Sequence, residues 1–298
     1  MGNLEGNFVV QIDGGIGRVL CAVPALEKLS ELRKVSVLTS FPEVFMHNPK
    51  IYKTYSLNRE YLWDDVIKHG HFLFPEPYFN HLYYNQIHHL MQSFNFLLTG
   101  DAGHVSTPNL YLTEDEKAWA SNFMEMRKQE FPGKDVVLLQ CFGSTAMLGE
   151  GGTTQDPTHR SLPSYAADAI CRNTNHLYVN ISHIPMDYSN VWQQQFTLRQ
   201  LFALAAHCDF VISIDSCLSH IGAAFGKRGL VFFGGTFPQN LSYPSYRVIQ
   251  REGYPKHYHP NRFSGFVDEN QDALSFDTGE LDKIIEVINA KDFEPAQI

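Results

Sequence analysis

The sequence is poor in positive charge and has no long apolar run. Its 23 Lys and Arg are outnumbered by 32 Asp and Glu, so that the formal net charge is −9. This balance argues against a protein that binds nucleic acid through a basic surface. No stretch reaches the roughly 18 apolar residues of a membrane-spanning helix, and the beginning, MGNLEGNFVV, lacks the regions of a signal peptide. We expect a cytoplasmic protein with no transmembrane segment.

Cysteine pairs and metal motifs are also missing. The five cysteines are scattered and form no CxxC pair, which favours free thiols in a reducing compartment over a disulfide framework or a zinc site. The 14 histidines form no HExxH motif, and their close pairs have no clear carboxylate partner. These pairs are His69/His71, His257/His259 and the adjacent His88/His89. We therefore expect no metal site.

What the chain does contain is enough apolar sequence for two cores. Its 298 residues, 44% of them hydrophobic, suit two α/β lobes. The helix-breaking sequence FPGK at 131–134 predicts the boundary. We expect an N-terminal lobe at 1–132 and a C-terminal lobe at 133–298, with the closing helix either in the second lobe or packed back on the first.

Apolar periodicity predicts strands that alternate with helices, which is typical of parallel sheets with right-handed crossovers. Ligands in such sheets bind at the carboxyl ends of the strands. In the first lobe we expect strands at 7–13 and 35–39, short segments near 52–56 and 65–67, and helices at 17–32, 41–47, from about residue 80, and 113–130. In the second lobe we expect strands at 136–140, 177–181, 210–214 and 229–233, and helices at 164–172, 198–207, 217–225 and 278–290.

The Gly-rich turn DGGIGR, residues 13–18, is the first candidate site. Glycines after a strand let a ligand approach the backbone, and the helix N-terminus behind them favours negative charge. Gly15 and Gly17 supply a GxG pattern, but position 20 is Leu where a dinucleotide fingerprint has its third glycine. A purely structural turn is the alternative.

The stretch DFVISIDSCLSH, which ends at His220, is the second candidate site. An apolar run leads into a predicted helix at Asp215 and Ser216. There, backbone N–H groups and the hydroxyls of Ser216 and Ser219 would donate to a phosphate. The next strand ends in another small polar turn, 234–236, and two such turns side by side predict a crevice. In the alternative, Asp215 or Ser216 only caps the helix and His220 packs.

The long Gly- and Thr-rich loop at 142–163 is the third candidate site. Loops of this length are commonly functional lids or disordered segments. Arg160 stands just before the next predicted helix, where its guanidinium could bind a diphosphate through two hydrogen bonds. A solvated arginine is the alternative. Ser144, near the beginning of the loop, is a further candidate.

Together these segments resemble glycosyltransferase family 9, the heptosyltransferase-like enzymes of lipopolysaccharide assembly. The stretch GGIGRVLCAVPALEKL is similar to that family's Gly-rich loop, helix and "PAL" sequence. The stretch IDSCLSHIGAAFGKRGLVFFGGT is similar to its Asp-[Ser/Thr]-Gly-x-x-His segment and the turn that follows, and HRSLP to its basic residue before Trp-Pro. The resemblance follows the chain in order and is strongest over 7–32 and 196–236.

The resemblance implies a GT-B fold, an α/β fold of two Rossmann-like lobes whose parallel sheets face a central cleft. The N-terminal lobe would hold the acceptor and the C-terminal lobe a nucleotide-sugar donor. No DxD motif is present in a suitable loop, in keeping with a metal-independent enzyme that needs no cofactor. The donor-binding residues that we expect are Gly15, Gly17, Ser144, Arg160, Asp215, Ser216, Ser219, His220, Gly235 and Thr236.

The chain departs from the family on the acceptor side. The family commonly has an aspartate general base directly after the Gly-rich turn, where this chain has Arg18. Because a base must take the proton of the acceptor hydroxyl, Asp13 on the same turn is the first candidate and Asp101 or His104 the next. Arg18 would instead bind an anionic acceptor or the diphosphate.

The function implied is transfer of a sugar from a nucleotide-sugar to a hydroxyl of a bacterial glycan of the lipopolysaccharide-core kind, in a bacterial or phage-infected cell. GT-B enzymes also glycosylate hydroxymethylated bases of phage DNA, and the locally basic segment 247–259 keeps that alternative open. A nucleotide-sugar epimerase and a nucleotide-sugar-binding protein that has lost its base are the remaining alternatives.

Overall fold

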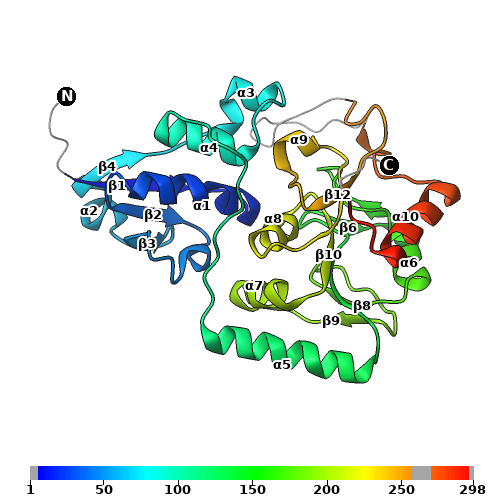
Figure 1. Cartoon of the computed structure of the whole chain (residues 1–298). Helices are drawn as coiled ribbons and strands as arrows, with labels where there is room; N and C mark the ends of the chain where they lie inside the picture. Colours follow the sequence, from blue (N-terminus) through cyan, green and yellow to red (C-terminus); the bar gives the residue numbers. More distant parts are fainter. Residues whose placement is uncertain (1–5, 257–269, 295–298) are drawn as a thin grey trace. The chain divides into compact units, whose positions relative to one another are not determined.

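Two separate parallel sheets organise the chain (Figure 1). In the computed structural model, which describes residues 6–256 and 270–294, the chain divides into unit 1, Met1–Thr113, and unit 2, Glu114–Ile298. The expected α/β class with parallel sheets is confirmed. Within the described residues, no helix combines the length and the apolar character needed to cross a membrane.

The sheet of unit 1 has the strand order β3-β2-β1-β4, and every neighbouring pair is parallel. Because β1 and β4 are neighbours, the residues that follow them emerge at the same edge. Helix α1, Ile16–Ser30, follows β1 and packs against α4, Leu90–Thr99. The strands are β1 Asn7–Ile12, β2 Val35–Thr39, β3 Lys53–Ser56 and β4 Gly70–Leu73.

Short helices fill the other connections of unit 1. The helix expected at 41–47 is a single 3-10 turn, because Met46 already has an extended backbone with ψ 134°. The helix expected from about residue 80 is split, because Gln86 has a left-handed φ of 59° and His89 then caps a new helix. The short helices are η1 Pro42–Phe45, α2 Leu62–Asp65, η2 Ile67–His69, η3 Pro77–Phe79 and α3 His81–Tyr84.

Unit 2 contains a six-stranded parallel sheet in the order β12-β11-β10-β5-β8-β9. Figure 1 shows α7 and α8 on one face of this sheet and α6 and α10 on the other. The strands are β5 Val136–Gln140, β8 Leu177–Asn180, β9 Val191–Gln193, β10 Phe210–Ile214, β11 Gly229–Phe232 and β12 Tyr246–Ile249. The helices are α5 Glu114–Glu130, α6 Ser164–Asn173, α7 Leu198–His207, α8 Cys217–Ala224, α9 Pro238–Leu241 and α10 Thr278–Ala290.

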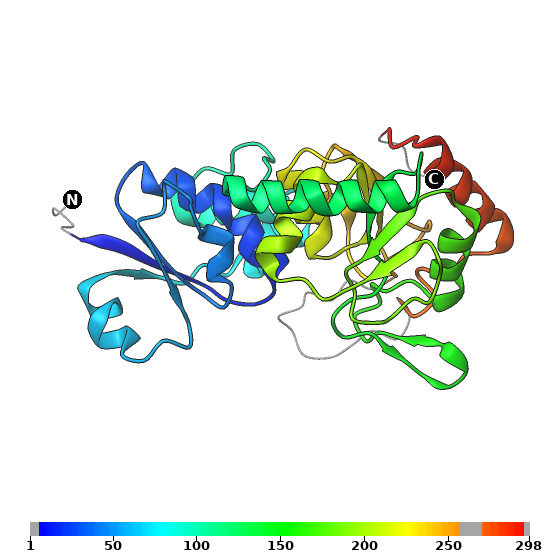
Figure 2. The same cartoon turned by 90° about the horizontal axis from the view of Figure 1, so that it is seen from below.

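The two strands that the sequence did not predict, β9 and β12, lie at the edges of this sheet. Both are short and only partly buried, so neither shows the apolar run of a central strand. The loop at 142–163 also contains a hairpin, β6 Met147–Leu148 paired with β7 Thr154–Gln155. The hairpin protrudes from unit 2 in Figure 2, so the loop has structure of its own.

Helix α5 belongs to unit 2, so the division falls after residue 113 instead of after residue 132. Figure 2 shows α5 alongside α7, against which it packs. Arg199 of α7 donates from Nε and Nη2 to the Glu116 carboxylate of α5 at 2.7 and 2.6 Å. Phe123 of α5 meets the ring of Phe196 edge-on. Because these contacts join α5 to unit 2, the FPGK sequence is a turn inside that unit.

The closing helix α10 packs against α6 within unit 2. Its Leu281, Ile284 and Ile288 belong to the same buried cluster as apolar residues of β5 and β10. Asp277 caps the helix by accepting a hydrogen bond of 2.8 Å from the backbone N–H of Glu280. The closing helix is therefore part of the core of unit 2.

We predict that the Glu116–Arg199 pair stabilises unit 2 by about 1–3 kcal/mol, because a bidentate pair with side chains only 23% and 11% exposed is weakly screened. A double-mutant cycle of Glu116→Gln and Arg199→Met, measured by urea unfolding, gives this coupling. The exposed pair Glu114–Lys117 on the same helix is the control, with an expected coupling below about 0.5 kcal/mol. Equal coupling in the two cycles would contradict the role assigned to Glu116.

Candidate functional site

Two neighbouring strands of unit 2, β10 and β11, carry polar residues at their carboxyl ends. Asp215 follows β10, and its Oδ2 accepts a hydrogen bond of 2.6 Å from Thr236 Oγ1, at the turn after β11. Burial raises the pKa of Asp215, while the charge of Arg160 and the Thr236 hydrogen bond act in the opposite direction. Asp215 is 3% exposed, so its carboxyl group lies inside unit 2, where it is the hydrogen-bond partner of Thr236.

The side chain of Gln140, the last residue of β5, serves the first turn of α8. Its Oε1 accepts a hydrogen bond from Ser216 Oγ and another, of 3.4 Å, from the backbone N–H of Leu218. Ser216 occupies the N-cap position, but its own side chain accepts no capping hydrogen bond. The amide of Gln140, which no sequence motif indicated, therefore occupies part of the predicted phosphate-binding position.

Ser219 and His220 both turn into unit 2. Ser219 is 1% exposed and donates to the backbone oxygen of Ser216 at 2.8 Å. His220 is 3% exposed, and its Nδ1 lies 2.7 Å from the hydroxyl of Tyr243. Burial lowers the pKa of His220 to about 4, so the ring is neutral at pH 7. The structure supports the alternative in which His220 packs.

Asp156 organises the second half of the loop at 142–163. Its carboxylate accepts hydrogen bonds from the backbone N–H and hydroxyl groups of both Thr158 and Ser161, and from Thr145 Oγ1 at 2.8 Å. Burial alone would raise the pKa of Asp156, but the hydrogen bonds outweigh it and lower the pKa to about 2. The loop is therefore built round an ionised carboxylate that the sequence analysis did not single out.

Arg160 is held beside the junction of β10 and α8 by neutral groups. Its Nε donates to Thr158 Oγ1 at 3.1 Å, and its Nη1 to the backbone oxygen of Asp215 at 3.4 Å. In the part of the chain that the structure describes, no carboxylate oxygen comes within ion-pair distance of this guanidinium. Ser144 is exposed on the same loop. The structure thus brings Arg160, Asp215 and Thr236 together, with a cation available to an anion.

Glycine is required where this loop meets the turn after β11. The N–H of Gly235 donates to the backbone oxygen of His159 at 3.0 Å. A Cβ on Gly234 would lie 2.2 Å from that oxygen, and one on Gly235 would lie 2.7 Å from the backbone oxygen of Thr158. Close packing of the Arg160 loop therefore explains both glycines, and Gly235 helps to place Arg160.

A cavity of about 580 Å³ opens beside the same loop. Asp156, His159 and Ser161 line it, together with residues of the β6–β7 hairpin and with Gln271 and Leu274. Its volume lies within the range of small-molecule sites. A ligand in this cavity would contact the residues on either side of Arg160.

In unit 1, β1 ends at Ile12, and Asp13 and the Gly-rich turn follow it. Gly14 has a left-handed φ of +85°, and a Cβ there would lie 3.2 Å from Arg18 Cδ, so the fold requires this glycine. Gly15 has an ordinary φ of −76°, and no described atom lies within 4 Å of the position of its Cβ. Within the described residues, neither the backbone conformation nor packing requires a glycine at position 15. Gly17 lies in the first turn of α1.

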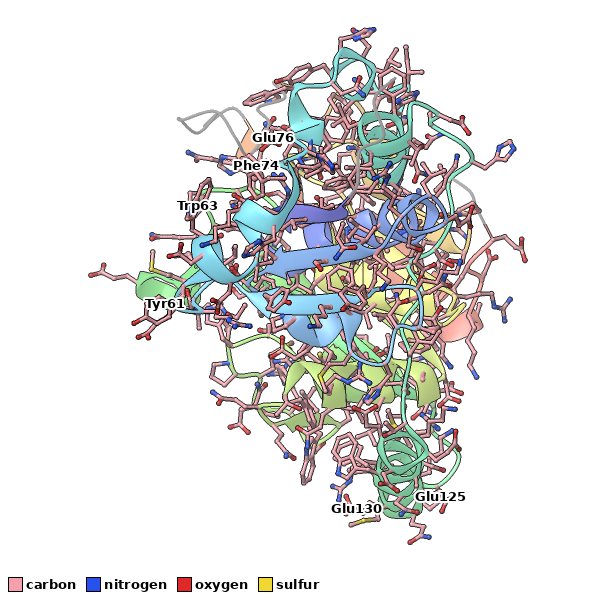
Figure 3. The ribbon with its side chains drawn as sticks, turned by 90° about the vertical axis from the view of Figure 1, so that its left-hand side faces the viewer. Tyr61, Trp63, Phe74, Glu76, Glu125 and Glu130 are labelled. Carbon is pink, nitrogen blue, oxygen red and sulfur yellow. The ribbon has the colours of Figure 1, made fainter. Side chains whose placement is uncertain are left out.

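Arg18 is buried and faces two carboxylates of its own unit. Its Nη1 donates to both oxygens of Glu76 at 3.1 Å, while Nη2 donates to the backbone oxygen of Pro75 at 3.0 Å and lies 3.5 Å from Asp13 Oδ1. Figure 3 shows Glu76 close to Phe74, on the segment that follows β4. The guanidinium is thus occupied internally, which corrects the expectation that Arg18 binds an anionic acceptor or the diphosphate.

The structure groups the other two base candidates with Lys28. Asp101 pairs with Lys28 Nζ at 2.7 Å, and Lys28 lies ten residues beyond Arg18 on α1, or about 15 Å along the helix. The Lys28 hydrogen bond is the main cause that lowers the pKa of Asp101, and the charge of the exposed His104 adds to it. Asp13 is therefore the one predicted base that lies on the Gly-rich turn.

The histidine pairs take part in packing. His71 meets the ring of Phe8 edge-on, and His89 caps α4. Across residues 6–256 and 270–294, no group of three His, Cys, Asp or Glu side chains is placed to hold a metal ion. His257 and His259 lie outside the described residues. All five cysteines are free, and the expected absence of a metal site stays a prediction.

Part of the sequence of unit 2 matches the model of a known family. The model of glycosyltransferase family 9 (heptosyltransferase) matches residues 185–256, which contain β10, Asp215, α8 and the Gly-rich turn after β11. No curated protein matches the sequence.

Solved structures resemble the whole chain. The family 9 glycosyl transferase of Veillonella parvula DSM 2008 has a TM-score of 0.63 at 12% identity, with 98% of this chain and 99% of that chain covered. The ADP-heptose LPS heptosyltransferase II of E. coli has a TM-score of 0.62 at 13% identity, with 96% and 98% covered. The dodecameric iron-containing heptosyltransferase TibC of enterotoxigenic E. coli H10407, solved with ADP-D-beta-D-heptose, has a TM-score of 0.62 at 12% identity, with 96% and 76% covered.

These findings confirm the predicted resemblance to glycosyltransferase family 9, over residues 185–256 for the sequence and over nearly the whole chain for the fold. They also confirm the GT-B type of α/β fold. At such low identity the solved structures establish the fold alone, and the site residues of this chain rest on its own geometry.

We predict that Asp156→Asn destabilises the protein by about 1–2 kcal/mol at pH 7, because an amide cannot accept the set of hydrogen bonds made by the carboxylate, and partial exposure reduces the full effect of the pKa shift. The folded pKa of about 2 lies below the ordinary value of about 3.9, so this stability is present above about pH 5. It is lost as the pH falls through 4 toward 2.

Urea unfolding of the wild type and the Asp156→Asn variant at pH 7, 5 and 3.5 measures this difference. Glu150→Gln, an exposed acid of the same loop, is the control and is expected to change stability by less than about 0.5 kcal/mol. A pH-independent difference for Asp156→Asn would contradict the assigned role.

Proposed function

We propose that this chain is a glycosyltransferase that binds a nucleotide-sugar at the β10–β11 edge of unit 2 and an acceptor hydroxyl at the β1–β4 edge of unit 1. The family match over residues 185–256 and the shared fold support this proposal. So does the position of the polar residues, at the strand ends where α/β proteins bind ligands.

The observation that carries the proposal is the environment of Arg160. Its guanidinium is fixed by Thr158 and the backbone of Asp215, and no carboxylate oxygen of the described residues lies within ion-pair distance of it. The start of α8 lies beside it, and a helix N-terminus adds positive potential. A diphosphate placed here would receive hydrogen bonds from a preorganised cation. The adjacent cavity of about 580 Å³ is large enough for the nucleoside part of the donor.

In the reaction, the bond between the anomeric carbon and the diphosphate breaks as the acceptor oxygen forms its new bond to that carbon. Negative charge then grows on the leaving diphosphate, and Arg160 together with the start of α8 would stabilise it electrostatically. We propose that these groups suffice, with no resident metal or cofactor.

Asp13 is the proposed general base. Its carboxylate lies at the end of β1, where Gly15 leaves open space in front of the backbone. Its side chain is 28% exposed, compared with 3% for Arg18. It would take the proton of the acceptor hydroxyl as that oxygen attacks the anomeric carbon.

The transferred sugar and the acceptor are proposed from the relatives. One of them is named an ADP-heptose lps heptosyltransferase, and TibC was solved with ADP-D-beta-D-heptose. We therefore propose ADP-heptose as the first donor to test and a lipopolysaccharide-core glycan as the first acceptor, with the reaction in the cytoplasm.

The DNA alternative gains no support. Three cations of the segment that motivated it face acids or backbone oxygens of unit 2: Arg247 pairs with Asp292 at 2.6 Å, Lys256 lies 3.7 Å from Asp272, and Arg251 donates to the Asp272 backbone oxygen at 2.8 Å. Residues 257–259 lie outside the described residues. An epimerase and a binding protein without turnover are outcomes that the following experiments separate from transfer.

We predict that a matching nucleotide-sugar raises the melting temperature of the protein, and that the shift persists in EDTA. Arg160→Met should weaken this binding about 10- to 100-fold, because charge-assisted hydrogen bonds to the diphosphate are lost. Arg172→Met, a surface arginine of the same unit, is the control and should bind like the wild type. A panel of nucleotide-sugars that leaves the wild-type melting temperature unchanged would refute the donor site.

We predict that Asp13→Asn lowers kcat for transfer by about 100-fold or more and leaves donor affinity within about twofold, because the amide cannot take the hydroxyl proton. Turnover with each acceptor, together with donor titration, measures both quantities. Asp101→Asn is the matched control and should retain wild-type kcat. Conversion of the donor in the absence of any acceptor would instead favour the epimerase.

A further inference from the structure

Three charged side chains meet at the β1–β4 edge of unit 1. Asp13 comes from the end of β1, Arg18 from the first turn of α1, and Glu76 from the segment after β4. Arg18 lies between the two acids, with Nη1 3.1 Å from both Glu76 oxygens and Nη2 3.5 Å from Asp13 Oδ1. Arg18 is thus in contact with a carboxylate from each side, one that follows β1 and one that follows β4.

Arg18 is fixed in place by more than charge. Its side chain is 3% exposed, and Nη2 also donates to the backbone oxygen of Pro75 at 3.0 Å. The guanidinium carbon lies 5.3 Å from the centre of the Tyr78 ring and 5.8 Å from that of Phe94. A buried arginine with this many contacts is rigid, so it determines where its carboxylate partners lie.

The two acids are held differently. Glu76 receives Nη1 on both of its oxygens, and its Oε1 also accepts the backbone N–H of Tyr78 at 3.4 Å. Asp13 Oδ1 lies 3.5 Å from Arg18 Nη2, a longer distance than the two to Glu76, and its side chain is more exposed, at 28% against 18% for Glu76. Glu76 is thus the anchored acid, and Asp13 is the acid placed to meet a substrate.

We propose that Arg18 and Glu76 are positioning residues for Asp13: Arg18 aims the Asp13 carboxylate, and Glu76 balances the charge of Arg18. This inference rests on the proposed function, in which Asp13 is the base. It assigns a role to the arginine that stands where the resemblance leads one to expect an acid. The second carboxylate of the cluster comes from the segment that follows the neighbouring strand β4.

The balance of charge is the physical reason for Glu76. In general, a guanidinium beside a carboxylate favours its ionised, less basic form, and a second carboxylate on the same guanidinium opposes that effect. Without Arg18, the two carboxylates would repel each other and favour protonation. Other titratable groups on or beside the elements round the cluster include Tyr78 of η3, His81, Tyr83 and Tyr84 of α3, and His88 and His89, which directly precede α4.

The test compares Arg18→Met and Glu76→Gln with the wild type in two measurements. One is the pH dependence of kcat for transfer, and the other is the titration of the Asp13 carboxyl by carbon NMR, assigned with Asp13→Asn. We expect the acidic limb of kcat and the NMR midpoint to move together by about 0.5–1 pH unit. The shift should be upward in Arg18→Met and downward in Glu76→Gln.

The maximal kcat distinguishes the effect of Arg18 on the position of the Asp13 carboxylate from the effect of its charge. Arg18→Met should lower the maximal kcat about 10- to 100-fold with little change in the KM for the donor, because the base loses its position. Arg18→Lys restores the charge but not the planar contacts, so its acidic limb should return toward that of the wild type while kcat stays low. Lys28→Met, on the same helix, is the control and should match the wild type in both measurements.

The outcomes are distinct. Shifts in opposite directions in both measurements support the proposal. NMR shifts with an unmoved kcat profile, or shifts of one sign in both variants, overturn it. A wild-type protein that transfers no sugar refutes the proposed function and the positioning role with it, and the NMR titration then shows whether the charge coupling itself exists. If Arg18→Met fails to fold, Arg18→Lys and Glu76→Gln supply the comparison.

Discussion

The hydrogen bonds of the Asp156 carboxylate are the constraint on which the candidate donor site depends. They bring together both ends of a segment that would otherwise be an open loop, since Thr145, Thr158 and Ser161 all donate to the same group. Arg160 lies between Thr158 and Ser161, so the hydrogen bonds of Asp156 to these two residues also hold Arg160 in place. An arginine on a mobile loop would lose conformational entropy on binding a diphosphate, whereas this one is already placed.

The two units place an arginine in different environments. The difference suits the two proposed roles, which are binding of the leaving diphosphate in unit 2 and positioning of the base in unit 1. In unit 2, Arg160 is held by neutral oxygens, so its charge is directed at an incoming anion. In unit 1, Arg18 contacts Asp13, Glu76 and two aromatic rings, so its charge interacts with groups of the protein itself. A leaving group needs a cation that is free to receive it, while a base needs a carboxylate that is held but not neutralised.

Local patterns predicted much of the fold. Helices α7 and α10 and strand β10 begin and end where the apolar periodicity places them. The division between the units was not predicted, because it depends on the packing of α5 against α7. The site was predicted only in part for a similar reason: Glu76 lies 58 residues from Arg18, and Gln140 lies 76 residues from Ser216. A single sequence contains no signal for pairs so far apart. The contact of His220 with Tyr243, 23 residues later, is another such pair, and for this reason the sequence predicts His220 beside a phosphate although the ring packs inside unit 2.

The close approach of the Arg160 loop to the turn after β11 has a consequence for how this site can change. Because the backbone oxygens of Thr158 and His159 occupy the space that Cβ atoms would need at Gly235 and Gly234, neither segment can be exchanged alone. A loop transplanted from a relative to alter donor preference would have to arrive with its own partner turn. In engineering and in evolution alike, the Arg160 loop and the turn after β11 are therefore expected to change together.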